Sequence, residues 1–181
     1  MSDVLDRYRL LADDFTTVVD GATETAWDNQ SPCTEWKARD VAAHVIGVHR
    51  HFLAGLDGTD EPTADPGDLG EAWRSTRAEL EAALADPDRS TTVVESPFGQ
   101  MPFEALVGRL LSLDLLIHTW DLARATGQDE AINEELSGHA LAGMKPLDGM
   151  IRGPGMFGAA VEAPAGASNR VQLLSFLGRT V

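Results

Sequence analysis

The sequence has little cysteine, and it lacks both a long apolar run and a secretory signal. Its one cysteine, Cys33, excludes an internal disulfide framework and a zinc site made of several thiolates. A transmembrane helix needs about 20 mostly apolar residues, and no run of that length occurs in the 181 residues. The N-terminal sequence is MSDVLDRYRLLADD, which has no apolar signal-peptide core. We therefore expect a cytoplasmic protein that does not span a membrane.

Basic residues are also scarce. Lys and Arg number 14 against 29 Asp and Glu, which gives a net charge of −15. Phosphate backbones and anionic membrane surfaces attract cationic proteins, so neither nucleic acid nor a membrane is an expected partner. Acidity identifies no substrate by itself, and the partner class that we expect is a small molecule. A homodimer is a possible assembly.

Hydrophobic residues make up 43% of the chain, which is enough for a core, and they recur mostly with helical spacing. The spacing predicts four principal helices: one over residues 2–19, one from near Thr34 to near Leu56, one that ends before Pro87, and a central one over 103–125. An acidic Gly/Pro-rich loop at 57–70 separates the second from the third. Such a pattern predicts a mainly α-helical protein built as a four-helix bundle.

Smaller elements complete the prediction. Residues 91–95 and 100–103 flank a Ser-Pro-Phe-Gly turn, which favours a short β-hairpin. Beyond the central helix we expect small C-terminal helices, one capped by Asn133 and one from Asn169 to Phe176. Gly178 would end the last helix, and a Gly/Pro/Met-rich segment at 153–158 would precede it.

The central helix carries an aspartate inside its most apolar run, LLSLDLLIHTWDL. Projected at about 100° per residue, Arg109, Ser112 and Thr119 fall on one side, which is the expected solvent face. Asp114 falls opposite that face, and His118 follows one turn later on the same side as Asp114. Burial of an unpaired carboxylate costs free energy, so this aspartate needs a partner. Two interpretations stay open: an Asp–His pair that joins two helices, and half of a metal site.

His44 adds a third candidate ligand. It lies on the second helix, at the edge of the apolar stripe formed by Val41, Val45 and neighbouring residues. A lone histidine in such a place is most often a core residue with satisfied hydrogen bonds. Together with Asp114 and His118, however, it gives three ligands from two helices. Three protein ligands with open positions are typical of catalytic metal sites, and bundle cores are where such sites are built.

Two stretches resemble a known family. Residues 33–45 read CTEWKARDVAAHV and resemble the second-helix motif of the DinB-like superfamily, in which Trp, a basic residue and Asp precede a metal-binding His. Residues 114–127 read DLLIHTWDLARATG and resemble its central-helix motif, a carboxylate four residues before a second His. The similarity is greatest to the N-terminal domain of mycothiol-dependent maleylpyruvate isomerase. It covers most of residues 1–127, and the tail FLGRTV is similar to short actinobacterial relatives.

The resemblance implies specific roles. His44 and His118 correspond to the two histidine ligands, and Asp114 corresponds to the carboxylate ligand, which is Glu in the isomerase. The shorter Asp side chain can alter the metal geometry or preference. Zinc suits this ligand set best, although Ni, Co or Fe also fit. The isomerase has a substantial second domain, whereas residues 128–181 are too few for one. We therefore expect residues 1–127 to form the metal-binding bundle and 128–181 to form a helical extension packed on it, not a full second domain.

The same resemblance implies a function. We expect a mononuclear metal-dependent enzyme that uses mycothiol or another low-molecular-weight thiol for transfer or isomerisation of a small molecule. The alternative is a non-catalytic ligand-binding or dimerisation bundle whose metal site is structural or vestigial. A third possibility is an Asp–His core pair that holds no metal.

Other polar residues near the motifs have two interpretations each. Asp40 and Asp121 are candidates to hydrogen-bond a ligand histidine and fix its tautomer. Alternatively, Asp40 pairs with a neighbouring Lys or Arg and Asp121 pairs with Arg124. A packing role is expected for Cys33, because a single thiol without a local His signature is a weak nucleophile candidate. His49 and His51 flank an arginine, a run typical of a solvated helix surface.

Overall fold

A computed structural model describes residues 3–60, 68–152 and 157–181. The chain divides into two compact units, Met1–Asp129 and Glu130–Val181. Residues 61–67 of the predicted 57–70 loop and residues 153–156 of the 153–158 segment lie outside the described residues. Within the described ranges, no helix combines the length and the apolar character needed to cross a bilayer.

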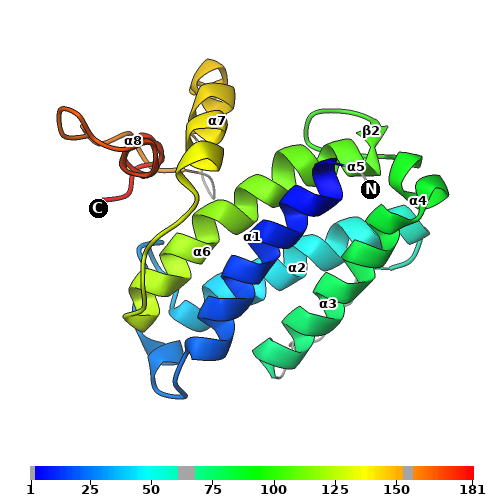
Figure 1. The fold of residues 1–181 in the computed structure, drawn as a ribbon, viewed down its shortest axis with the longest axis horizontal. Helices are drawn as coiled ribbons and strands as arrows, with labels where there is room; N and C mark the ends of the chain where they lie inside the picture. Colours follow the sequence, from blue (N-terminus) through cyan, green and yellow to red (C-terminus); the bar gives the residue numbers. More distant parts are fainter. Residues whose placement is uncertain (1–2, 61–67, 153–156) are drawn as a thin grey trace. The chain divides into compact units, whose positions relative to one another are not determined.

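Four long helices form the core of the first unit as the structure describes it (Figure 1). They are α1 (Asp3–Gly21), α2 (Ala38–Asp57), α3 (Leu69–Ala85) and α6 (Ser112–Thr126). α1 packs against α3 and α6, and α2 packs against the same two helices, so the four close around one core. The predicted helical bundle is therefore confirmed.

The contacts between α1 and α3 show how the sequence pattern becomes a core. Leu5, Leu11 and Phe15 form part of an apolar stripe on α1 that is buried. Phe15 meets Trp73 edge to face with ring centroids 4.8 Å apart. The indole Nε1 of Trp73 donates a hydrogen bond to Thr16 Oγ1 at 2.8 Å, so the buried ring keeps no unpaired donor. Asp68 caps α3 by accepting from the backbone N–H of Glu71.

The prediction that the second helix starts near Thr34 is wrong, because α2 starts at Ala38. Glu35 has φ +68°, a left-handed conformation that interrupts helix propagation. The backbone N–H of Ala38 donates to Asn29 O, which closes residues 29–37 into a loop before the helix. This loop carries Cys33 and Trp36, so neither belongs to a helix.

The predicted central helix contains a change of winding. After α4 (Pro87–Thr91), the hairpin strands β1 (Val93–Val94) and β2 (Met101–Pro102) pair antiparallel, as expected. The chain then forms α5 (Phe103–Leu106), a π-helical turn η2 (Val107–Leu111) and α6. A π turn changes the angular phase of a helix and is often found near functional sites.

The prediction that Arg109, Ser112 and Thr119 form the solvent face of this helix is only partly correct. Arg109 is exposed, but Ser112 and Thr119 are buried, as is every residue from 115 to 123. Because α1 and α2 both pack on α6 and the π turn shifts the phase after Arg109, a single projection across 109–119 fails. Thr119 satisfies its hydroxyl by donating to Leu115 O at 2.7 Å.

The second unit contains α7 (Glu134–Met144), the 3₁₀ turn η3 (Lys145–Leu147) and α8 (Asn169–Phe176), and α7 packs against α8. Asn133 caps α7 as predicted. Ser168 caps α8 in place of Asn169, whose amide donates to Glu134 O. Gly178 follows α8 with φ +85°, where a side chain would be strained. That residues 128–181 pack on the bundle stays a prediction.

Candidate metal centre

Three candidate ligands from two helices converge in the first unit. α2 supplies His44, and one face of α6 supplies Asp114 and His118. The Nε2 atom of His44 lies 3.4 Å from Asp114 Oδ1, and the Nε2 atom of His118 lies 3.4 Å from the same oxygen. One nitrogen of each histidine and one carboxylate oxygen thus lie within 4.8 Å of one another. The predicted residues are brought together.

This group lies at the boundary between core and solvent. The side chain of His44 is 32% exposed, whereas those of Asp114 and His118 are 17% and 10% exposed. The ring of Trp36 lies beside both histidines, with centroid distances of 4.8 Å to His44 and 6.0 Å to His118. Solvent therefore reaches the group on the His44 side, and an aromatic ring flanks it.

The electrostatics of the group are strongly coupled. Burial alone would raise the pKa of Asp114, but the charges and hydrogen bonds of His118 and His44 hold that pKa well below its usual range. Burial alone would lower the pKa of His118, but the Asp114 carboxylate and hydrogen bonds with Asp114, Asp121 and Cys33 raise it well above its usual value. Asp114 is an anion at neutral pH and therefore attracts positive charge to this place.

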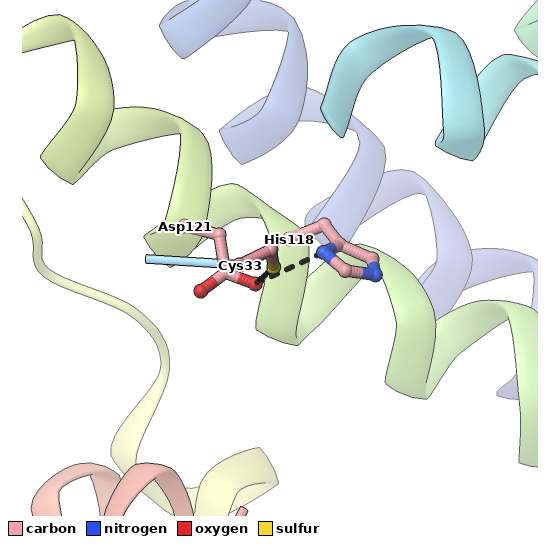
Figure 2. A group of neighbouring side chains, drawn as sticks. All are labelled: Cys33, His118 and Asp121. Carbon is pink, nitrogen blue, oxygen red and sulfur yellow. Dashed lines mark hydrogen bonds and ion pairs between the residues drawn. The ribbon is translucent and has the colours of Figure 1, made fainter. Parts of the chain in front are cut away.

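A second group of ligand-type atoms uses the other edge of the same imidazole (Figure 2). The Nδ1 atom of His118 lies 3.0 Å from Asp121 Oδ2, and the thiol of Cys33 donates to that oxygen at 3.3 Å. Cys33, His118 and Asp121 also satisfy the distance condition for a metal site. The side chain of Asp121 is fully buried.

The two groups differ in hydrogen-bond chemistry. The 3.0 Å contact between His118 and Asp121 has the length of an ordinary N–H···O bond, which puts a proton on Nδ1. In a neutral imidazole Nε2 then carries a lone pair directed at Asp114. Two acceptors that face each other need a cation or an additional proton between them. The His44 group can hold either of these between His118 and Asp114, and Asp121 fixes the tautomer of His118.

Asp40 does not join this cluster. It is exposed, and its carboxylate accepts a hydrogen bond from the backbone N–H of Lys37 at 2.8 Å, which caps the start of α2. The predicted surface position of His49 is wrong: its side chain is buried, and its Nδ1 atom lies 2.7 Å from Val45 O. The α2 stripe is wide enough to bury His49 against Tyr8 and Trp73. His51 is exposed, as expected.

Cys33 is the site residue that the sequence did not indicate. It lies 88 positions before Asp121 and contacts it only because the 29–37 loop folds against α6. The side-chain amide of Asn29 fastens that loop by donating to Ala125 O at 2.9 Å. Spacing along the chain carries no signal for such a contact.

Comparisons with known proteins agree with this fold. Residues 8–123 match the family described as mycothiol maleylpyruvate isomerase N-terminal domain. Two proteins described as uncharacterized, from two strains of Mycobacterium tuberculosis, are each 32% identical over 181 residues, with 99% of both chains covered.

Two crystal structures are similar in fold, those of the mycothiol-dependent maleylpyruvate isomerase and of its histidine-to-alanine mutant. Each has a TM-score of 0.60 at 17% identity, and the match covers 83% of this chain and 72% of theirs. The likeness carries information about the fold alone. The family resemblance predicted from the two motifs is confirmed.

Proposed function

The chain belongs to the mycothiol maleylpyruvate isomerase N-terminal domain family, and from that premise we propose that it is a mononuclear metal-dependent enzyme acting on a small molecule. His44, Asp114 and His118 hold a divalent cation, of which zinc is the best match to the ligand set, with nickel, cobalt and iron as alternatives. A low-molecular-weight thiol, mycothiol in the first instance, is the proposed cosubstrate. The reaction class is thiol transfer or thiol-assisted isomerisation.

One observation carries the metal proposal: Asp114 faces two histidine nitrogens and still has an unsatisfied oxygen. Its Oδ2 atom is buried and has no hydrogen-bond partner among the described residues. An ionised carboxylate in that situation is costly unless a cation compensates it. The 3.4 Å separations also match two ligands about 2.0–2.1 Å from one tetrahedral ion, which lie about 3.3 Å apart.

The chain's own residues divide the remaining tasks. Asp121 holds His118 in the tautomer that leaves Nε2 free to donate its lone pair. Trp36 shields one side of the two histidine rings, and the partly exposed His44 marks the side from which a substrate reaches the site. A divalent cation supplies Lewis acidity there, which lowers the pKa of a water or thiol so that an anion exists at neutral pH. This accessible arrangement favours a catalytic over a closed structural site.

Metal analysis tests the first half of the proposal. The wild-type protein, His118→Ala and the control His139→Ala, which removes an exposed histidine of α7, are each incubated with zinc, dialysed and measured for metal per chain. We expect about one zinc in the wild type and the control and a large loss in His118→Ala. A wild type without zinc, whose His118 is an imidazolium paired with Asp114, would establish the purely structural Asp–His core.

Thiol dependence tests the second half. Calorimetric titration of the zinc-loaded protein with mycothiol is compared with S-methyl mycothiol, which lacks the ionisable thiol. We expect mycothiol to bind and S-methyl mycothiol not to bind. Removal of zinc should abolish the binding of mycothiol. Turnover is then assayed with maleylpyruvate as the electrophile. Zinc binding without any thiol response would favour the non-catalytic ligand-binding or dimerisation bundle.

A further inference from the structure

We propose that Cys33 is a positioning residue for the metal centre, acting through Asp121 on His118. This inference rests on the proposed function, because it assigns the thiol a task in holding a metal ligand. Figure 2 shows the three side chains together, with the thiol beside the Asp121 carboxylate oxygen that faces the imidazole. The thiol is neither a ligand of the ion held by His44 nor a nucleophile in this assignment.

The first step concerns Asp121, which is buried and ionisable. Its Oδ2 atom accepts from His118 Nδ1 at 3.0 Å and from Cys33 Sγ at 3.3 Å. The Asp121 side chain is fully buried. A buried carboxylate without hydrogen-bond donors costs free energy, so Asp121 requires them. Both donors reach the same oxygen, so the thiol restrains the carboxylate in the rotamer that faces His118.

The second step concerns the two edges of the imidazole. Cys33 lies on the Nδ1 side of His118, whereas His44 and Asp114 lie on its Nε2 side. The lone-pair directions of the two ring nitrogens diverge, so one ion cannot bind both Nε2 and the Cys33 sulfur without a rearrangement. Hydrogen bonding at one ring nitrogen decides which nitrogen is protonated and which can bind a metal.

The third step concerns the loop that carries Cys33. The backbone N–H of Cys33 donates to Ser31 Oγ at 3.2 Å, and its carbonyl accepts from Gln30 Nε2 at 3.2 Å and from Trp36 N–H at 3.1 Å. The same loop holds Trp36 beside the two ligand histidines. The backbone of Cys33 is therefore held near α6 by hydrogen bonds that do not involve Asp121.

Cobalt(II) binding to the full chain tests the assignment, with Cys33→Ala and Cys33→Val as variants without a donor and Cys33→Ser as the variant that keeps one. Affinity is measured by chelator competition, and the electronic spectrum and the proton resonance on His118 Nδ1 are recorded. Cys33→Val fills the space of the sulfur if Cys33→Ala does not fold. We expect both donor-less variants to bind cobalt about 3- to 10-fold more weakly and Cys33→Ser within about 2-fold of wild type, because direct partners of ligands contribute about 10- to 100-fold.

The outcomes separate this inference from the proposed function. Equal cobalt affinity and an unchanged His118 Nδ1 resonance in all variants would overturn the role of Cys33 and leave the metal centre standing. An intense sulfur-to-cobalt charge-transfer band in the wild type, lost in Cys33→Ser, would make Cys33 a ligand and would also overturn it. A wild type that binds no cobalt or zinc would refute the metal centre itself.

Discussion

His118 and Asp121 lie three residues apart on α6 and share a 3.0 Å hydrogen bond that decides which imidazole nitrogen faces Asp114. This bond places the Nδ1 proton on the buried side of the ring and leaves Nε2 toward the partly exposed His44. The two carboxylates around His118 therefore have different tasks, although both belong to the same helix. Asp121 orients the imidazole, and Asp114 shares the proposed ion with it.

Replacement of Asp121 tests this division. Asp121→Asn keeps the size of the side chain but offers an amide donor that can turn toward Nδ1 and favour the opposite tautomer. We expect metal affinity to fall by about 10- to 100-fold while the helical content stays unchanged. Chelator competition measures the affinity and circular dichroism the helicity. Asp6→Asn, an exposed change on α1, is the matched control, and an equal loss in both variants would contradict the orienting role.

Metal addition should stabilise the first unit. Zinc that binds only the folded state, at 100 times its dissociation constant, adds about 2.7 kcal/mol, which corresponds to roughly 5–10 °C in the melting temperature. Asp114→Asn removes the charge that attracts the cation and should abolish the zinc-dependent shift. Differential scanning calorimetry with and without zinc or EDTA measures both. A shift that persists in Asp114→Asn would show that zinc stabilises the fold elsewhere.

The burial of His49 predicts that the protein loses stability in mild acid. Burial lowers the pKa of His49 from 6.5 to about 4. The charge of Asp114 and the hydrogen bond with Val45 O partly oppose this decrease, whereas the charge of His44 adds to it. Between these pH values the unfolded chain binds a proton at His49 that the folded chain does not. This contribution to the free energy of unfolding is therefore lost as pH falls from 6.5 to about 4, by up to about 3 kcal/mol.

Urea unfolding at a series of pH values measures that loss. His49→Leu cannot take up the proton in either state, so its stability should fall less steeply across this window than that of the wild type. His51→Leu changes an exposed histidine on the same helix and should keep the wild-type slope. Parallel slopes for His49→Leu and the wild type would refute the assignment.

Replacement of Tyr8 by Phe should stabilise the protein. Its hydroxyl is buried and has no hydrogen-bond partner among the described residues. Burial, and secondarily the charge of Glu81, raises the pKa of Tyr8, so the hydroxyl stays protonated. Tyr8→Phe removes the unpaired polar group, and we expect about 1 kcal/mol of added stability in urea unfolding. Destabilisation would mean that a buried water satisfies the hydroxyl.

Much of the fold could be predicted because it depends on local patterns. The apolar stripe of α1, the cap at Asn133 and the hairpin turn each follow from neighbouring residues. The predictions that failed depend on more distant contacts. The start of α2 fails at Glu35, where a loop closed by Asn29 replaces the first helical turn. The burial of Thr119 and His49 depends on how many helices surround each position, which periodicity along one helix does not specify.

The candidate site shows the same division. The sequence by itself determined that Asp114 and His118 share one face of a helix, because residues four apart are neighbours there, and it indicated His44 as the partner from the second helix. Only the tertiary structure decided that Asp121 meets Cys33. The physical reason is that helical periodicity fixes directions within one element, whereas the thiol reaches its carboxylate through the folding of a loop across 88 positions.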